Sequence, residues 1–351
     1  MSVIPVDFRA LQHGDLDYSH AEWHESQQSQ SDFSAINLGA SLYVPATRLD
    51  LATIASGWKL PELRSVIFCT EDAVHERDLE AALSHLAALL PELKSGPLLR
   101  FIRPRNPAIL RRLLQMEGIE RIHGFVLPKF GPHTLGDWLR VWDDRHGHYL
   151  LPILETAEVF DRRRMELLRD RLEDSGLGEQ VLGLRIGGND LLNLLGIRRA
   201  RGATIYDTPL RGVIADLVCI FHPAGYCLSA PVFERLDTPE VLAREVEADL
   251  QYGLIGKSAI HPAQIPVIEA RYRVCCDDYE MASAVLALDA AAVFKRCETF
   301  CEPATHRRWA AGMLERARVF GVVGVGCDSI NDPAQAAGYS TDGGAQQAAG
   351  N

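Results

Sequence analysis

Eight short apolar segments recur along the chain, and this repeat constrains the fold more than any other feature. Each is followed by a polar turn and then by a helix-like stretch. The segments end near Val44, Cys69, Arg103, Pro128, Glu155, Asp190, Tyr226 and His261, about 31 residues apart on average. Short strands that alternate with helices form parallel sheets, and an eight-unit barrel of ~250 residues has about 31 residues per unit. The spacing therefore predicts a (β/α)8 TIM barrel with extra C-terminal helices.

The repeat divides the 351 residues into four segments. Residues 1–36 are polar and predict an arm before the barrel; we interpret its three histidines (13, 20 and 24) as solvated rather than as a metal cluster. Residues 37–270 hold the barrel. Residues 271–327 predict a helical extension, with helices over about 269–294 and 305–320. Residues 328–351 are small and polar, which predicts a disordered tail.

Composition excludes several classes of function. A net charge of −11 argues against a surface for nucleic acid or anionic membranes. No apolar run approaches the ~20 residues that span a bilayer, and the first residues lack the pattern of a secretion signal. None of the eight cysteines forms a CxxC pair, which favours reduced thiols over a zinc site. We therefore expect a cytoplasmic protein.

Two of the predicted strands end in an acidic residue. Glu155 follows the run 151–154, and Asp190 follows the run 184–186 and a Gly-Gly-Asn segment. Catalytic groups of TIM barrels lie at the carboxyl ends of the strands, where neighbouring strands bring such residues together. Magnesium is bound by one or two carboxylates, with waters and substrate completing its shell. Glu155 and Asp190 are thus the predicted metal ligands, with Mg²⁺ as the metal and Mn²⁺ as the alternative.

Charged residues also follow the second and third strands. Arg103 and Arg105 flank Pro104, and an arginine here can bind a carboxylate through two N–H groups or form a surface salt bridge. We favour Arg103 because its strand is apolar. Glu71 and Asp72 either cap the next helix, or support the metal site, or order Arg103 through hydrogen bonds.

Lys129 and His261 complete the candidate set. Lys129 follows the fourth strand, where a lysine can form a Schiff base or stay protonated beside an acid such as Glu155; the second alternative is favoured. His261 ends the eighth strand in Ala-Ile-His-Pro-Ala-Gln. It could bind substrate, although holding the closing strand in register is the favoured alternative.

The order of these motifs resembles the citrate lyase β-subunit and HpcH/HpaI aldolase family of Mg²⁺-dependent C–C bond lyases. The resemblance extends from about Leu38 to Glu269, and its most specific match is the segment 259–265. Ser-Leu-Tyr-Val-Pro, Glu-Asp-Ala-Val, Pro-Lys, Glu-Thr-Ala and Gly-Asn-Asp-Leu follow in the family's order. One departure is clear: Cys69-Thr70 stands where the family usually has Asp-Leu.

The resemblance implies that Glu155 and Asp190 bind the metal, that Arg103 binds a substrate carboxylate, and that the chain forms a homo-oligomer, a trimer or hexamer. It implies cleavage or formation of a C–C bond next to a 2-oxo acid, with an acyl-CoA as a further candidate substrate. The general base stays open among Glu71, a metal-bound water and another subunit. Two alternatives remain: a CoA-thioester hydrolase that uses the same metal, and a non-catalytic paralogue that acts in a protein complex.

Overall fold

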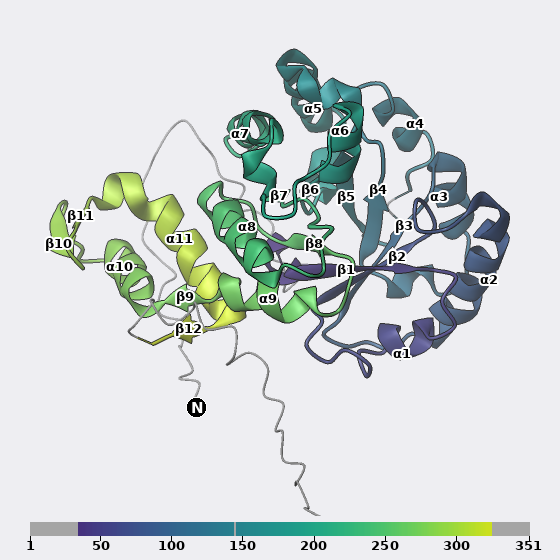
Figure 1. The fold of residues 1–351 in the computed structure, drawn as a ribbon, viewed down its shortest axis with the longest axis horizontal. Helices are drawn as coiled ribbons and strands as arrows, with labels where there is room; N and C mark the ends of the chain where they lie inside the picture. Colours follow the sequence, from purple (N-terminus) through teal and green to yellow (C-terminus); the bar gives the residue numbers. More distant parts are fainter. Residues whose placement is uncertain (1–33, 144, 325–351) are drawn as a thin grey trace, which may run out of the picture. The chain divides into compact units, whose positions relative to one another are not determined.

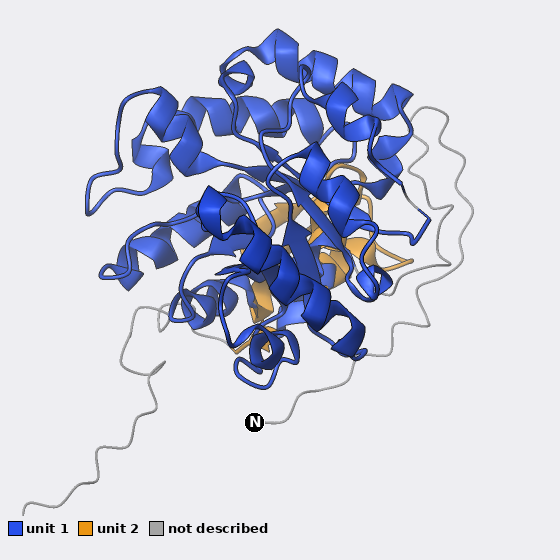
Figure 2. Ribbon diagram, turned by 90° about the vertical axis from the view of Figure 1, so that its right-hand side faces the viewer, with its two compact units in different colours: residues 1–273, 315–321 blue, residues 274–314, 322–351 orange. Residues whose placement is uncertain are grey.

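The computed structural model describes residues 34–143 and 145–324. The described chain forms two compact units, coloured separately in Figure 2. The first contains residues 34–273 and 315–321, and the second contains residues 274–314 and 322–324. The predicted arm with its three histidines lies almost wholly outside the described residues, and the predicted tail lies entirely outside them. The four-segment division stays a prediction.

The first unit is built on one parallel sheet of eight strands. In chain order they are β1 (Ala40–Pro45), β2 (Ser65–Cys69), β3 (Leu99–Arg103), β4 (Gly124–Leu127), β5 (Tyr149–Leu154), β6 (Leu184–Ile186), β7 (Leu228–Ser229) and β8 (Lys257–Ala259). Each of β1 to β6 pairs with the next strand in sequence, and β8 pairs with β1. Ala230, just after β7, forms an isolated bridge with Lys257, so the two edges of the sheet meet. The predicted TIM-barrel fold is confirmed, and every predicted strand is present.

Helices follow the strands and surround the sheet (Figure 1). They are α1 (Leu51–Ala55), α2 (Leu79–Leu89), α3 (Pro107–Leu113), α4 (Leu135–Leu139), α5 (Arg162–Asp174), α6 (Gly188–Leu194), α7 (Leu210–Phe221), α8 (Pro239–Gln251) and α9 (Gln264–Tyr272). Local sequence explains some of their starts. Asn106 caps α3 by accepting a hydrogen bond from the Ile109 N–H (3.0 Å), with Pro107 as the first helical residue.

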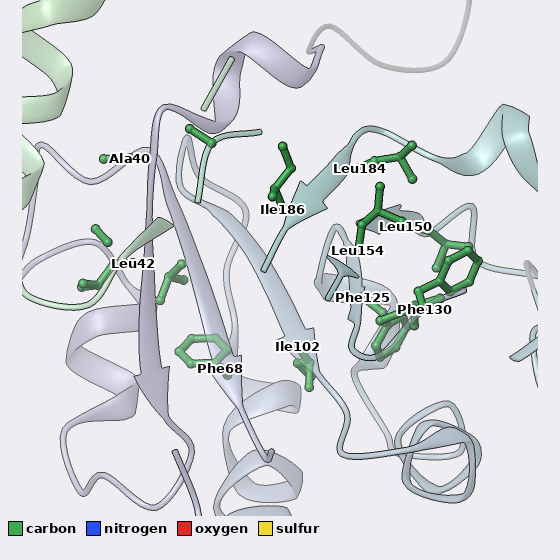
Figure 3. Close-up of a cluster of buried hydrophobic side chains, with 14 of the residues drawn as sticks. Ala40, Leu42, Phe68, Ile102, Phe125, Phe130, Leu150, Leu154, Leu184 and Ile186 are labelled. Atoms are coloured by element: carbon green, nitrogen blue, oxygen red, sulfur yellow. The ribbon is translucent and has the colours of Figure 1, made fainter. Parts of the chain in front are cut away.

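Strand residues alternate between two hydrophobic layers. One layer packs the strands against the helices; Phe68, Ile102 and Leu154 belong to it and appear in Figure 3. The other consists mainly of strand residues that fill the barrel interior: Ile67, Phe101, Val126, Leu151 and Ile153. Because side chains alternate along a strand, the parity of a position decides which layer it enters.

The second unit begins where the prediction of one long helix over 269–294 is wrong. Helix α9 ends at Tyr272, and Arg273 is extended (φ −61°, ψ 146°). The next elements are β9 (Val274–Cys275), α10 (Cys276–Leu286), the antiparallel pair β10 (Phe294–Arg296) and β11 (Thr299–Cys301), α11 (Pro303–Phe320) and β12 (Val322–Val323). The break exists because β9 pairs with β12. The helix predicted near 305–320 is confirmed as α11. Among the described residues, no helix has the length and apolarity to cross a bilayer.

Candidate active site

Three polar side chains lie at strand positions whose side chains face the barrel interior, at the carboxyl ends of their strands. Cys69 is two residues past Ile67, Arg103 two past Phe101, and Glu155 two past Ile153. Each stands at or just beyond the end of a strand whose preceding interior residue is apolar. The alternation of side chains along the strands therefore places the sulfur of Cys69, the guanidinium of Arg103 and the carboxylate of Glu155 at the carboxyl end of the barrel.

Glu155 is almost fully buried, with a relative exposure of 3%. Its Oε1 accepts a hydrogen bond from the Lys129 backbone N–H (2.8 Å). Burial raises the pKa of Glu155 to about 7, and the negative charge of Asp190 adds to the rise, while Lys129 and Arg103 partly offset it. A nearby cation stabilises the ionised form of a buried carboxylate such as this one.

The ammonium of Lys129 lies between the two predicted metal ligands. It pairs with Asp190 Oδ1 and lies 3.5 Å from Glu155 Oε1. Burial alone would lower the pKa of Lys129, but the charges of Glu155 and Asp190 raise it above its ordinary value. Because a Schiff base needs a neutral amine, this environment favours the protonated alternative.

The two carboxylates fit a magnesium ion. Both reach the same Lys129 nitrogen, so their oxygens converge on one cation position. Gly187 makes the space: a Cβ there would lie 2.3 Å from Glu155 Cβ and 2.5 Å from its Oε2. No cluster of three or more His, Cys, Asp or Glu suited to a metal occurs within residues 34–143 and 145–324. A pair of carboxylates suits Mg²⁺, which keeps several waters and binds substrate oxygens.

Arg103 is buried and paired with the acids that follow β2. Its Nη1 lies 3.1 Å from Glu71 Oε2 and 3.7 Å from Asp72 Oδ2. Glu71 is buried and also accepts a hydrogen bond from the Asp72 N–H (2.8 Å), whereas the Asp72 side chain is more than half exposed. Burial raises the pKa of Glu71, and Arg103 opposes that rise.

Neither Glu71 nor Asp72 caps a helix, so the capping alternative is wrong. Helix α2 begins at Leu79, after a short 3-10 turn at Glu76–Asp78. The acids instead lie in a turn closed by the Val74 N–H donating to the Glu71 carbonyl (2.9 Å). Arg105 holds this turn, because its guanidinium donates to the carbonyls of Thr70 and Glu71, both at 3.2 Å, and to that of Val74.

His261 lies apart from these contacts. The residue is exposed, and its Nδ1 accepts a hydrogen bond from the Ala263 N–H (3.2 Å). Gln264 performs the anchoring there: it accepts from the Ile260 N–H (2.9 Å) and donates to the Phe233 carbonyl (2.6 Å). The contacts of His261 are local, and its predicted substrate role has no geometric support.

Two site residues were missed by the sequence patterns. Arg103 donates from Nε (3.2 Å) and Nη2 (3.0 Å) to Cys69 Sγ, and its Cζ lies 5.0 Å from the centre of the Tyr43 ring. The alternation of residues along β1 and β2, which directs Tyr43 and Cys69 into the barrel interior, is the sequence feature that could have identified them. Their contact with Arg103 depends on the pairing of β1, β2 and β3.

Solved structures of citrate lyase type share this fold at low identity. CitE from Mycobacterium tuberculosis, solved with magnesium, acetoacetate and coenzyme A, is 23% identical with a TM-score of 0.59; the match covers 80% of this chain and 98% of that one. A citrate lyase from Burkholderia xenovorans LB400 is 19% identical with a TM-score of 0.64, over 85% and 96% of the two chains. A citrate lyase beta subunit from M. tuberculosis, solved with oxaloacetate and magnesium, is 20% identical with a TM-score of 0.51, over 68% and 99%. These likenesses establish the fold.

A search of curated proteins gives no match. The family described as C-C bond lyase of the TIM-barrel fold matches residues 32–322, more than four fifths of the sequence. The chain belongs to this family of C-C bond lyases of the TIM-barrel fold.

Proposed function

We propose that the protein is a Mg²⁺-dependent lyase that cleaves or forms a C–C bond next to a 2-oxo acid. One observation carries this proposal: Glu155 and Asp190 converge on a single cation position at the carboxyl end of the barrel. A bound Mg²⁺ would act there as a Lewis acid toward the carboxylate and carbonyl oxygens of the 2-oxo acid.

Arg103 has the chemistry to bind and orient a substrate carboxylate. A guanidinium presents paired N–H donors, and burial beside Tyr43 and Cys69 limits its motion. An arginine held in one orientation fixes the reacting bond relative to Glu155 and Asp190. Asp72, whose carboxylate is exposed, is proposed to contact substrate beside Arg103.

Lys129 is the proposed stabiliser of negative charge, and Glu71 is the proposed general base. The Lys129 ammonium is a cation beside the metal ligands, where it can stabilise negative charge that develops on a substrate oxygen. Glu71 is buried with a raised pKa, which brings its proton affinity closer to neutral pH and suits a general base. A metal-bound water and a residue of another subunit remain alternatives for the base.

The relatives support the substrate class. Magnesium and oxaloacetate occur together in one citrate lyase structure, and magnesium, acetoacetate and coenzyme A in another. We therefore propose a 2-oxo acid as one substrate and an acyl-CoA as its partner.

The test is to incubate the protein with Mg²⁺, acetyl-CoA and one of pyruvate, glyoxylate or oxaloacetate, and to analyse CoA species by mass spectrometry. A new acyl-CoA with the summed mass of both substrates supports the lyase, and Glu155→Gln should abolish it. Release of CoA with neither such an adduct nor the free acid that its hydrolysis would give indicates thioester hydrolysis instead. No conversion, together with no binding heat for any of the 2-oxo acids, indicates a non-catalytic protein.

A further inference from the structure

The guanidinium of Arg103 is held on two sides by side chains that are not carboxylates. Its side edge, Nε and Nη2, faces Cys69 Sγ at 3.2 and 3.0 Å. One face lies over the Tyr43 ring, with Cζ 5.0 Å from the ring centre. Cysteine sulfur is a weak hydrogen-bond acceptor, and an aromatic face attracts a cation without accepting a directed hydrogen bond.

The strands fix this arrangement. Cys69 and Arg103 are register partners at the last positions of β2 and β3. The Thr70 N–H and hydroxyl both donate to the Arg103 carbonyl, at 3.0 and 2.9 Å, which ties the two strand ends together. Tyr43 on β1 also contacts Arg185, whose Cζ lies 5.6 Å from the centre of the same ring. The Arg103 side chain therefore has little freedom to leave its position.

Two negatively charged carboxylates already lie beside the single positive charge of Arg103. Glu71 Oε2 at 3.1 Å and Asp72 Oδ2 at 3.7 Å give it two carboxylate neighbours. A carboxylate at position 69 would add a third, at the edge now facing sulfur. Each added anion lowers the attraction that remains for an incoming carboxylate.

We infer that Cys69 and Tyr43 are positioning residues that hold Arg103 in place while leaving its charge available to a substrate carboxylate. The inference rests on the proposed function, because it takes Arg103 as the carboxylate-binding group. It gives Cys69, which stands where the family usually has Asp, a role in substrate affinity.

Pyruvate is the probe, titrated by calorimetry into the full-length protein saturated with Mg²⁺. Cys69→Ala removes the acceptor and should weaken pyruvate binding about tenfold; Cys69→Ser keeps an acceptor and should stay within about threefold of wild type. Cys69→Asp should weaken binding about tenfold, because its carboxylate competes for the guanidinium. Tyr43→Leu should cost about fivefold through loss of the aromatic face, whereas Tyr43→Phe keeps that face and the affinity.

Two controls separate this role from general damage. Mg²⁺ titrated alone should bind Cys69→Ala and Tyr43→Leu as it binds wild type, since Glu155 and Asp190 are unchanged. Arg103→Gln should lose pyruvate binding and keep Mg²⁺ binding. Thermal unfolding of each ligand-free variant establishes that it is folded.

The outcomes distinguish the two proposals. Pyruvate binding that is intact in wild type, lost in Arg103→Gln and unchanged in Cys69→Ala and Cys69→Asp overturns the positioning role alone. Equal pyruvate affinity in Arg103→Gln and wild type would show that Arg103 does not bind the substrate, and this would overturn the positioning role. A wild-type protein that binds neither Mg²⁺ nor pyruvate overturns the proposed function and the positioning role with it.

Discussion

Lys129 contacts Glu155 through two groups: its backbone N–H donates to Oε1 at 2.8 Å, and its ammonium lies 3.5 Å from the same oxygen. The backbone at Lys129 has φ of +50°, an uncommon conformation for a residue other than glycine. This conformation lets a single residue after β4 reach the end of β5 twice. The contact links the proposed metal ligand to a cation that belongs to the protein.

Removal of this cation should strengthen metal binding. Lys129→Met leaves Glu155 and Asp190 without their shared ammonium, so Mg²⁺ meets no resident competitor. We expect the Mg²⁺ dissociation constant to fall about tenfold, measured by calorimetry. Lys129→Arg keeps a cation and should keep the wild-type affinity; equal affinities in all three proteins would show that the ammonium does not compete.

The space beside Glu155 depends on Gly187. A Cβ at this position would lie 2.3 Å from Glu155 Cβ, so Gly187→Ala should displace the carboxylate and weaken Mg²⁺ binding at least tenfold. Gly183→Ala is the matched control, because its Cβ would meet nothing closer than 3.5 Å, an ordinary contact. Mg²⁺-induced shifts in the unfolding temperature compare the two variants; a normal shift in Gly187→Ala would contradict the account.

A buried ion cluster next to β8 should dominate stability. The Lys257 ammonium, fully buried, donates to Glu245 (2.9 Å) and Asp249 (2.7 Å), which are fully buried too. Lys257→Met removes the ammonium from both acids, although Glu245 keeps an ion pair with Arg199 (3.2 Å), and should lower the free energy of unfolding by about 3–5 kcal/mol. Urea unfolding measures this, with Lys295→Met, which breaks an exposed pair with Glu298, as a control that should change little.

Stability should fall in mild acid through His148. Burial lowers the pKa of His148, and the charge of His146 lowers it further, although the hydrogen bond to the Ile119 carbonyl (3.0 Å) opposes the shift. No residue in the described part of the chain accepts or donates at Nδ1, so a proton added there stays unpaired.

Because the folded pKa lies below the unfolded value of about 6.5, the contribution of His148 is fully present above pH 6.5. It is lost as the pH falls through the folded pKa. Urea unfolding between pH 8 and pH 5 should show a smaller loss for His148→Gln, which keeps a donor for Ile119, than for wild type. Identical pH profiles would refute this role.

The strands, and the two carboxylates that we propose as metal ligands, could be identified from sequence because their signals are local. Most strands are short apolar runs; Glu155 follows β5 directly, and Asp190 follows β6 after a short Gly-Gly-Asn segment. A repeat near 31 residues then leaves few folds other than a closed barrel.

The features that the sequence did not predict depend on contacts between residues far apart in the chain. The break after Tyr272 results from pairing of Val274 with Val322, which no local pattern reveals. The role of Cys69 depends on Arg103, its register partner on the next strand. Glu71 and Asp72 looked like helix caps because acids favour helix starts, and only the structure places the helix seven residues later.

The most direct test of the central claim is a Mg²⁺ titration of Asp190→Ala by calorimetry, with Asp174→Ala, an exposed acid on α5, as the control. If Glu155 and Asp190 hold the metal, Asp190→Ala loses Mg²⁺ binding while remaining folded by thermal unfolding, and Asp174→Ala binds as wild type does. Unchanged Mg²⁺ affinity in a folded Asp190→Ala protein would contradict the account.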